Sequence, residues 1–511
     1  MNRYEQFLKL GIIYSFGQLV EKGLTFFLIP IYTAFLSPKD YGIIGLMSVT
    51  VGLITSIFFP PIINGFNRHY YSPDFKRFQE ELVFNSYLFV IIQSALLALV
   101  FHYLSRLLAE AILGNKYLRD VINLYAVILF FSPLAVFSLN LIRMQERART
   151  YIVISASNLL FSGGLTIYLL IFQKLRFYSL IYGNLFGVIY MSLILIPIVV
   201  KSCKFTLSLS ILIRPLKYGY PMILAGVSIF LINAGDRYVL RLFSALSRVG
   251  VYSFSYSFAG VINLVLAQPL KYAINPIVYK QEENEEYLKK FLRNSANYFY
   301  FISCFACLAL SLHGEEVFHL MVRNKDFLIG WSIVPILAFS YAQHALGTIL
   351  GKGPAMAKKG FHISGIVGIA CIVNLGLNFL LIPYYGIMGA AFATLVSYVV
   401  WNTLNIYYSA KFYDLHFELE RLGHITIIGV SLYLLSLLVA SGPSIYLNIS
   451  VKALIVIAYP IILLMTGFFS RREKQYMKNF FFEARANGIL ATVRHLGVET
   501  GEAEEGVGEV I

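Results

Sequence analysis

Four charged side chains lie inside long apolar stretches, where a charge is costly and therefore suggests function. Glu21 and Lys22 lie within residues 11–36, and Asp236 and Arg237 lie within residues 218–240. At the rise of an α-helix, Lys22 is about 17 Å from the start of its stretch, too deep to reach water easily. Lys22 is therefore a candidate to line a cavity and bind an anion, and a structural ion pair is the alternative.

The neighbours of these charges suggest further roles. Glu21 lies about 100° around a helix from Lys22 and so faces elsewhere, which makes it a candidate for carrying a coupling proton or pairing with a cation. Gln18 shares a helix face with both residues and is a candidate for a polar helix interface. For Asp236 (a coupling candidate) and Arg237 (an anion-binding or gate candidate), an ion pair at a helix end is the simpler interpretation.

Other polar residues occupy the ends and interiors of apolar stretches. Arg68 and Lys271 lie at the ends of stretches, where each could bind an anionic group or simply determine topology. His344 could titrate near neutral pH and serve in coupling, although a hydrogen-bonded structural role is simpler. Asn374 and Asn378 lie one helical turn apart and need partners in an apolar medium, which predicts hydrogen bonding between helices.

The composition identifies the elements that must position these residues. Of 511 residues, 58% are hydrophobic and 13% are charged, against about 45–50% and about 25% in soluble domains. This excludes a soluble enzyme, a disordered chain and a disulfide-stapled module. The sequence predicts an all-α polytopic membrane protein with about fourteen spans, and twelve or thirteen remain possible. The predicted spans are 11–36, 41–66, 82–104, 120–142, 151–172, 178–200, 218–240, 250–270, 294–312, 328–351, 362–382, 386–410, 424–440 and 453–468.

The basic residues between the spans predict an orientation. The net charge is +14, and the loops on one side carry 28 Lys and Arg against 11 on the other. Because basic loops stay in the cytoplasm, both termini are predicted to be cytoplasmic. This topological use of the charge also argues against nucleic acid as a partner.

A weak internal repeat predicts the domain organisation. With an offset of 208 residues, Phe35–Gly42 aligns with Phe243–Gly250, and Gly52 aligns with Gly260. The even number of spans in the offset predicts two parallel six-helix bundles, a common plan for transporters. The predicted organisation is an amino-terminal bundle 1–200, a cytoplasmic linker 201–217, a carboxy-terminal bundle 218–410, two additional spans in 411–468 and a cytoplasmic tail 469–511.

Two motifs resemble a known family. The first combines Asp236–Arg237–Tyr238 with Val249–Gly250–Val251–Tyr252, and the second runs from Asn374 through Asn378, Pro383 and Gly386 to Gly389–Ala390–Ala391. Together they resemble the polysaccharide transporters of the MOP superfamily, which is MATE-like, and in particular the Wzx-like flippases. The second motif is shared across that superfamily, whereas the first favours the polysaccharide branch.

The resemblance implies a function, a substrate and a location. It implies a flippase that moves a polyprenyl-pyrophosphate-linked oligosaccharide from the cytoplasmic to the outer leaflet by alternating access. Such a protein would supply O-antigen, capsule or exopolysaccharide synthesis in a bacterial inner membrane. Its partners would be the lipid-linked oligosaccharide, membrane lipids and other polysaccharide-assembly proteins. Coupling to H⁺ or Na⁺ stays open, and no cofactor or metal is expected.

Three alternatives remain beside this interpretation. A MATE-type drug antiporter and a lipid II flippase belong to the same superfamily, although a cation exporter should carry acidic residues in its cavity. A polysaccharide polymerase or ligase is the alternative from a different class. The predicted outer loops of about 15 residues leave little room for a catalytic domain, and the chain has no Walker, HExxH or GxSxG motif. We therefore expect a transporter rather than an enzyme.

Overall fold

The computed structural model describes residues 28–267, 269–270, 274, 278, 285–357, 359–439, 445–469 and 474–475. These residues form helices and contain no strand. Twelve of the described helices are long and apolar enough to cross a membrane, or thirteen if the bent pair Leu209–Gly219 and Ile223–Ala234 is one span. The prediction of an all-helical, multi-pass membrane protein is confirmed, whereas the predicted count of fourteen spans is not.

The chain divides into two compact units, Met1–Glu418 and Leu419–Ile511. The second unit contains α20 (Leu419–Val439) and α21 (Ile445–Met465), which pack against each other. Because both helices are almost entirely apolar, each is suited to a membrane span.

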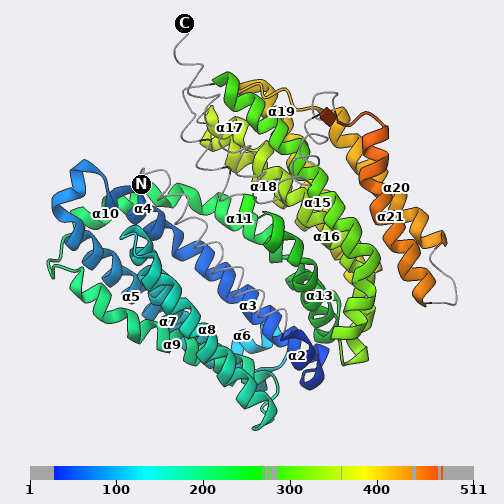
Figure 1. Ribbon diagram of the computed structural model, residues 1–511. Helices are drawn as coiled ribbons and strands as arrows, with labels where there is room; N and C mark the ends of the chain where they lie inside the picture. Colours follow the sequence, from blue (N-terminus) through cyan, green and yellow to red (C-terminus); the bar gives the residue numbers. More distant parts are fainter. Residues whose placement is uncertain are drawn as a thin grey trace, which may run out of the picture. The chain divides into compact units, whose positions relative to one another are not determined.

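The first unit begins with an amino-terminal group of helices (Figure 1). Its main members are α2 (Ile29–Phe35), α3 (Pro38–Phe58), α4 (Pro60–Tyr70), α5 (Gln79–Tyr103), α7 (Arg119–Met144), α8 (Ala148–Ile171) and α9 (Phe177–Lys201). The start of α3 is fixed by a capping box, in which the side chains of Ser37 and Asp40 each accept from the other's backbone N–H. Pro38 at the first helical position reinforces that start because its missing N–H would have no helical partner.

A carboxy-terminal group completes the first unit. It comprises α11 (Ile223–Ala234), α12 (Asp236–Phe243), α13 (Leu246–Ala259), the π-helical turn η5 (Asn263–Ala267), α15 (Glu285–Met321), α16 (Val334–Leu350), α17 (Lys352–Met356), α18 (Gly360–Tyr385) and α19 (Ile387–Phe412). Helices α18 and α19 form a tight hairpin, and the turn residue Gly386 has φ +55°. Glycine suits this position because it adopts positive φ without a steric penalty.

Residues 202–222 connect the two groups. The sequence predicts a linker over 201–217, but the structure contains α10 (Leu209–Gly219) there, followed by the short 3₁₀-helix η4 (Tyr220–Met222). Helices α10 and α11 are bent by 51° relative to each other. The predicted span 218–240 is therefore interrupted twice, at η4 and again at Gly235 between α11 and α12.

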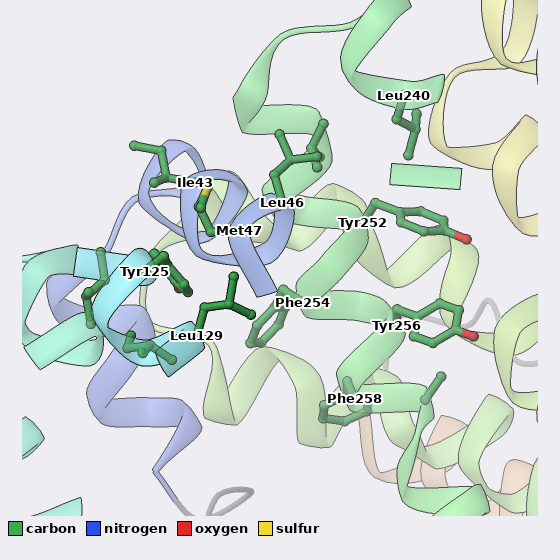
Figure 2. Close-up of a cluster of buried hydrophobic side chains, with 14 of the residues drawn as sticks. Ile43, Leu46, Met47, Tyr125, Leu129, Leu240, Tyr252, Phe254, Tyr256 and Phe258 are labelled. Atoms are coloured by element: carbon green, nitrogen blue, oxygen red, sulfur yellow. The ribbon is translucent and has the colours of Figure 1, made fainter. Parts of the chain in front are cut away.

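A continuous apolar core joins the groups. Figure 2 shows Ile43, Leu46 and Met47 of α3 close to Tyr125 and Leu129 of α7 and to the helix α13. Leu46 and Met47 are fully buried. In the same view, the rings of Tyr252 and Tyr256 extend to one side of α13 and that of Phe254 to the other. Helix α13 therefore presents an apolar face to the amino-terminal group and phenol hydroxyls to its own group.

The groups approach most closely where α3 crosses α13. A Cβ atom added to Gly42 would overlap the carbonyl oxygen of Leu246, and one added to Gly250 would overlap that of Pro38. The repeat offset aligns Gly42 with Gly250 and Pro38 with Leu246. The contact is thus reciprocal between repeat-related positions, and glycine is required because the backbones themselves touch.

A second reciprocal crossing joins α4 and α10. A Cβ atom on Gly65 would overlap the carbonyl oxygen of Pro215, and one on Gly219 would overlap that of Pro61. Each glycine follows a proline by four residues, so the two Pro-x3-Gly segments pack face to face.

Candidate functional site

A buried ion pair lies at the start of α12. Asp236 is fully buried and Arg237 is 7% exposed, and their Oδ1 and Nη1 atoms are 3.1 Å apart. Removing two charges from water costs several kcal/mol for each ion, so such a pair persists only with further partners. Those partners identify the elements that build the site.

The carboxylate of Asp236 is held from three helices. The hydroxyl of Tyr252 on α13 donates a hydrogen bond to Oδ2. The hydroxyl of Thr394 on α19 lies 3.5 Å from the same oxygen. With Arg237 on the other oxygen, both carboxylate oxygens are occupied by donors, as the buried negative charge requires.

The guanidinium of Arg237 is also enclosed. Its Nε donates to Ser253 Oγ at 3.2 Å, and Nη1 donates to the carbonyl oxygen of Asn233 at 3.0 Å. The guanidinium carbon lies 4.4 Å from the ring centroid of Tyr256, in a cation–π contact. Arg237 is thus engaged by protein groups and fixes the position of Tyr256.

A layer of phenols extends the network toward α16 and α19. The amide oxygen of Asn233 accepts from Tyr398 at 2.7 Å and from Tyr256 at 3.4 Å. The hydroxyl of Tyr341 lies 3.5 Å from the carbonyl oxygen of Tyr256. The hydroxyls of three helices therefore converge beside the ion pair.

A cavity of about 440 Å³ adjoins this layer, since Tyr256 and Tyr341 belong to both. Its walls come from α2, α3 and α9 of the amino-terminal group and from α13, η5 and α16 of the carboxy-terminal group. The lining residues are Ile29, Tyr32, Tyr41, Leu180, Phe254, Tyr256, Ser257, Gly260, Val261, Asn263, Leu264 and Tyr341. Among the residues that the structure describes, this lining contains no charged side chain.

One polar wall atom of the cavity lacks a protein partner. The Oδ1 atom of Asn263 is buried and accepts no hydrogen bond within the described chain. Asn263 begins the π-helical turn η5, and such turns occur frequently at functional sites. Four tyrosines with one unsatisfied amide acceptor suit an uncharged, hydroxylated ligand, because aromatic faces pack on its C–H surface and the polar atoms bind its hydroxyls.

Only some of the predicted site residues lie within the part of the chain that the structure describes. Gln18, Glu21, Lys22 and Lys271 lie outside the described residues, so their roles stay predictions. Arg68 is exposed near the end of α4 and does not line the cavity.

The remaining predicted residues lie within the carboxy-terminal group. His344 stacks on Trp401, with ring centroids 5.6 Å apart, and its ring centroid is 5.1 Å from that of Tyr398. Asn378 donates to Asn374 at 3.0 Å, and both are fully buried in α18. Their amides thus pair along one helix, whereas the sequence suggested bonds between helices.

Sequence reasoning missed the phenols that complete the site. Tyr252 and Tyr256 lie one turn apart on α13, and this spacing is the one signal that the sequence offers. The chain contains 36 tyrosines, so tyrosine identity alone could not single out Tyr341 or Tyr398. Asn263 carries no sequence signal because its importance comes from a cavity formed by six separate elements.

Sequence comparisons relate the chain to glycan-assembly proteins. Residues 31–325 match a family described as polysaccharide biosynthesis protein. Over 195 residues, the chain is 25% identical to the probable low-salt glycan biosynthesis flippase Agl15 of Haloferax volcanii. That alignment covers 38% of this chain and 41% of the relative, so only about two fifths of the relative's length is matched.

Solved structures share the fold. A lipid II flippase MurJ in an inward closed conformation superimposes with a TM-score of 0.73 and 13% identity, covering 90% of this chain and 100% of that chain. An inward-facing multidrug resistance MATE family transporter of the MOP superfamily gives a TM-score of 0.62 and 13% identity, covering 80% of this chain and 96% of that chain. At these identities, the likeness concerns the fold.

Proposed function

The chain belongs to the polysaccharide biosynthesis protein family, and from this premise we propose that it is a flippase for a polyprenyl-pyrophosphate-linked oligosaccharide. The substrate moves from the cytoplasmic to the outer leaflet of a bacterial inner membrane, where it feeds surface polysaccharide synthesis. The MOP-superfamily fold supports transport, and the family supports a glycan substrate.

The observation that carries this proposal is the cavity between the two helical groups. Tyr32 and Tyr41 line it from one group, and Tyr256 and Tyr341 line it from the other. A sugar bound there contacts both groups at once, so a relative motion of the groups changes its access to the two membrane faces. The polyprenyl tail remains in the lipid, where it needs no polar partner.

We assign Arg237 a positioning role rather than contact with the pyrophosphate. Its guanidinium is occupied by Asp236, Ser253, the backbone of Asn233 and the ring of Tyr256. The pyrophosphate therefore requires other cations, for which Lys22, Arg68 and Lys271 remain the proposed residues. Asp236 remains a candidate for proton coupling because its protonation would remove the charge that pairs with Arg237.

The test is a flipping assay in proteoliposomes. The substrate is a fluorescent polyprenyl-pyrophosphate oligosaccharide, and a glycosidase confined to one side reports which leaflet exposes the sugar. We expect flipping by the wild-type protein and a loss of at least tenfold in Lys22→Ala, with Lys39→Ala as a control at an exposed lysine. Absence of flipping by folded wild-type protein, across several glycans, would overturn the proposal.

A MATE-type antiporter is the second candidate because the fold is shared. A cation exporter should present carboxylates to its substrate, yet the described lining of the cavity contains none. Proton-driven efflux of a cationic dye by the same proteoliposomes, without flipping of any lipid-linked glycan, would favour this second function.

A further inference from the structure

We infer that the amino-terminal half of α15 carries a binding site for an anionic phospholipid of the cytoplasmic membrane leaflet. The site is a groove of about 550 Å³. Its described lining comes from Leu270 and from α15 between Tyr287 and Ile302. The groove shares no lining residue with the cavity between the two helical groups, and the inference does not depend on the proposed function.

The length of α15 places the groove at the membrane surface. The helix has 37 residues, which span about 55 Å, whereas the hydrocarbon core of a bilayer is about 30 Å thick. The predicted span begins at residue 294 and is the ninth, so with a cytoplasmic amino terminus it enters the membrane from the cytoplasm. Lys290 therefore lies one turn outside the apolar span, at the level of the lipid headgroups, and Ile302 lies about 12 Å inside it.

The polarity of the lining changes along the helix in the same order as along a phospholipid. Lys290 supplies a cation at the headgroup level. The next turn supplies the amide of Asn294 and the hydroxyl of Ser295, which suit the glycerol and ester oxygens. Phe299 and Ile302 follow and present apolar surface to an acyl chain. A soluble anion would leave this apolar half unused, whereas basic pockets on the cytoplasmic side of membrane helices bind anionic lipid headgroups.

Of the three cations in the first turns of α15, Lys290 is the one without an acidic partner among the described residues. Lys289 pairs with Glu285 at 2.7 Å, and Arg293 lies 3.7 Å from Glu418. Lys290 points about 100° around the helix from Lys289 and is exposed. Its charge is therefore available to a ligand in the groove.

The groove faces away from the main described partner of α15, which is α16. Tyr300 marks the side that contacts α16, because its hydroxyl accepts a hydrogen bond from Gln343 at 2.7 Å. Tyr298 and Ile302 each lie two positions from Tyr300, about 200° around the helix. The side chain of Ile302 is 46% exposed. An exposed apolar face of a membrane helix meets lipid, so a lipid can enter the groove from the side.

Native mass spectrometry of the delipidated protein tests the cationic half of the site. Phosphatidylglycerol is the anionic probe, and phosphatidylcholine is the zwitterionic comparison. We expect the first lipid bound by the wild-type protein to be phosphatidylglycerol, with at least tenfold tighter binding than phosphatidylcholine, and we expect Lys290→Gln to remove this preference. Lys201→Gln, which removes an exposed charge at the end of α9, is the control and should keep the preference within twofold. Equal binding of both lipids by the wild-type protein, or an unchanged preference in Lys290→Gln, would overturn the inference.

A second variant tests the apolar half of the site. Ser295→Phe fills the groove without changing a charge, so it should weaken binding of phosphatidylglycerol at least tenfold while circular dichroism shows an unchanged helix content. Glycerol phosphate, which has the headgroup chemistry without acyl chains, should not compete. Unchanged binding by Ser295→Phe, or competition by glycerol phosphate, would overturn the assignment to a lipid. Displacement of phosphatidylglycerol by an equal concentration of a polyprenyl pyrophosphate would overturn the assignment to a phospholipid.

Discussion

The two helical groups differ in charge at two positions that the sequence repeat aligns. Asp236 and Arg237 of the carboxy-terminal group fall on Leu28 and Ile29 of the amino-terminal group. Ile29 is buried in the apolar core, whereas the acid and the base form a hydrogen-bonded ion pair. At the aligned place, the amino-terminal group packs with two apolar residues. The charged network is then not required by the architecture, which is a reason to look for its purpose in transport.

The largest effect should come from breaking the ion pair. Arg237→Met leaves Asp236 buried without its counter-charge, which should lower the free energy of unfolding by about 3–5 kcal/mol. Chemical denaturation in detergent micelles measures this loss. The double change Asp236→Leu with Arg237→Ile installs the residues of the other group and should recover most of the stability.

Flipping by that double variant then separates structure from function. A stable protein with flipping reduced at least tenfold would show that the pair serves transport. A stable protein that flips normally would show that the ion pair has only a structural role. The charge difference between the two groups would then have no function in transport.

A substitution that creates a cavity in the apolar core of the amino-terminal group provides the matching perturbation. Leu46 is fully buried among the residues of Figure 2, so Leu46→Ala should cost about 3 kcal/mol. Because this core carries no charge, the rate of flipping per folded molecule should stay within twofold of wild type. A specific loss of flipping at unchanged folded fraction would contradict the view that this core is scaffold.

The hydroxyl of one buried tyrosine should have a smaller effect. Tyr252→Phe removes a donor to the Asp236 carboxylate, and a hydrogen bond to a charged group contributes about 1.5–3 kcal/mol. Tyr125→Phe in the apolar core is the matched control because Tyr125 is also buried and its hydroxyl bonds an uncharged group, Ser48. We expect about 1 kcal/mol or less for the control. Equal losses in both variants would argue against a charged carboxylate at Asp236.

Thr394→Val should have the smallest effect. Its hydroxyl lies 3.5 Å from Asp236 and also donates to the carbonyl oxygen of Ala390 at 3.0 Å, so the carboxylate gains little from it. We expect a loss of about 0.5 kcal/mol, measured by the same denaturation. A loss comparable with that of Tyr252→Phe would mean that α19 supports the ion pair more strongly than the geometry indicates.

The sequence predicted the fold well because spans are encoded locally. Long apolar stretches mark the helices, and Pro383 to Gly386 marks the hairpin between α18 and α19. The breaks in the predicted span 218–240 were missed because Tyr220–Met222 and Gly235 lie within an apolar stretch whose hydropathy continues through them. Helix α10 was missed because the basic residues of 201–217 suggested a loop.

The site was predicted only where charge made it conspicuous. Asp236 and Arg237 stand out in an apolar stretch, but their partner Thr394 lies 158 residues further along the chain. Which tyrosine covers a guanidinium depends on how α13, α16 and α19 pack, and that packing leaves no local pattern. Lys22 is likewise conspicuous as a charge in an apolar stretch. It lies outside the described residues, so its role stays a prediction that the flipping assay tests.

The reciprocal glycine contact also has a consequence for the order in which helices pair while the chain is being synthesised. Gly42 and Gly250 are separated by 208 residues, and a ribosome adds about 5–20 residues per second, so α3 waits about 10–40 s for α13. During that interval, the crossing face of α3 lacks this partner. Gly65 and Gly219 are separated by 154 residues, so their partnership can form first. The newborn chain can therefore join α10 to α4 before α13 is made and the two groups meet.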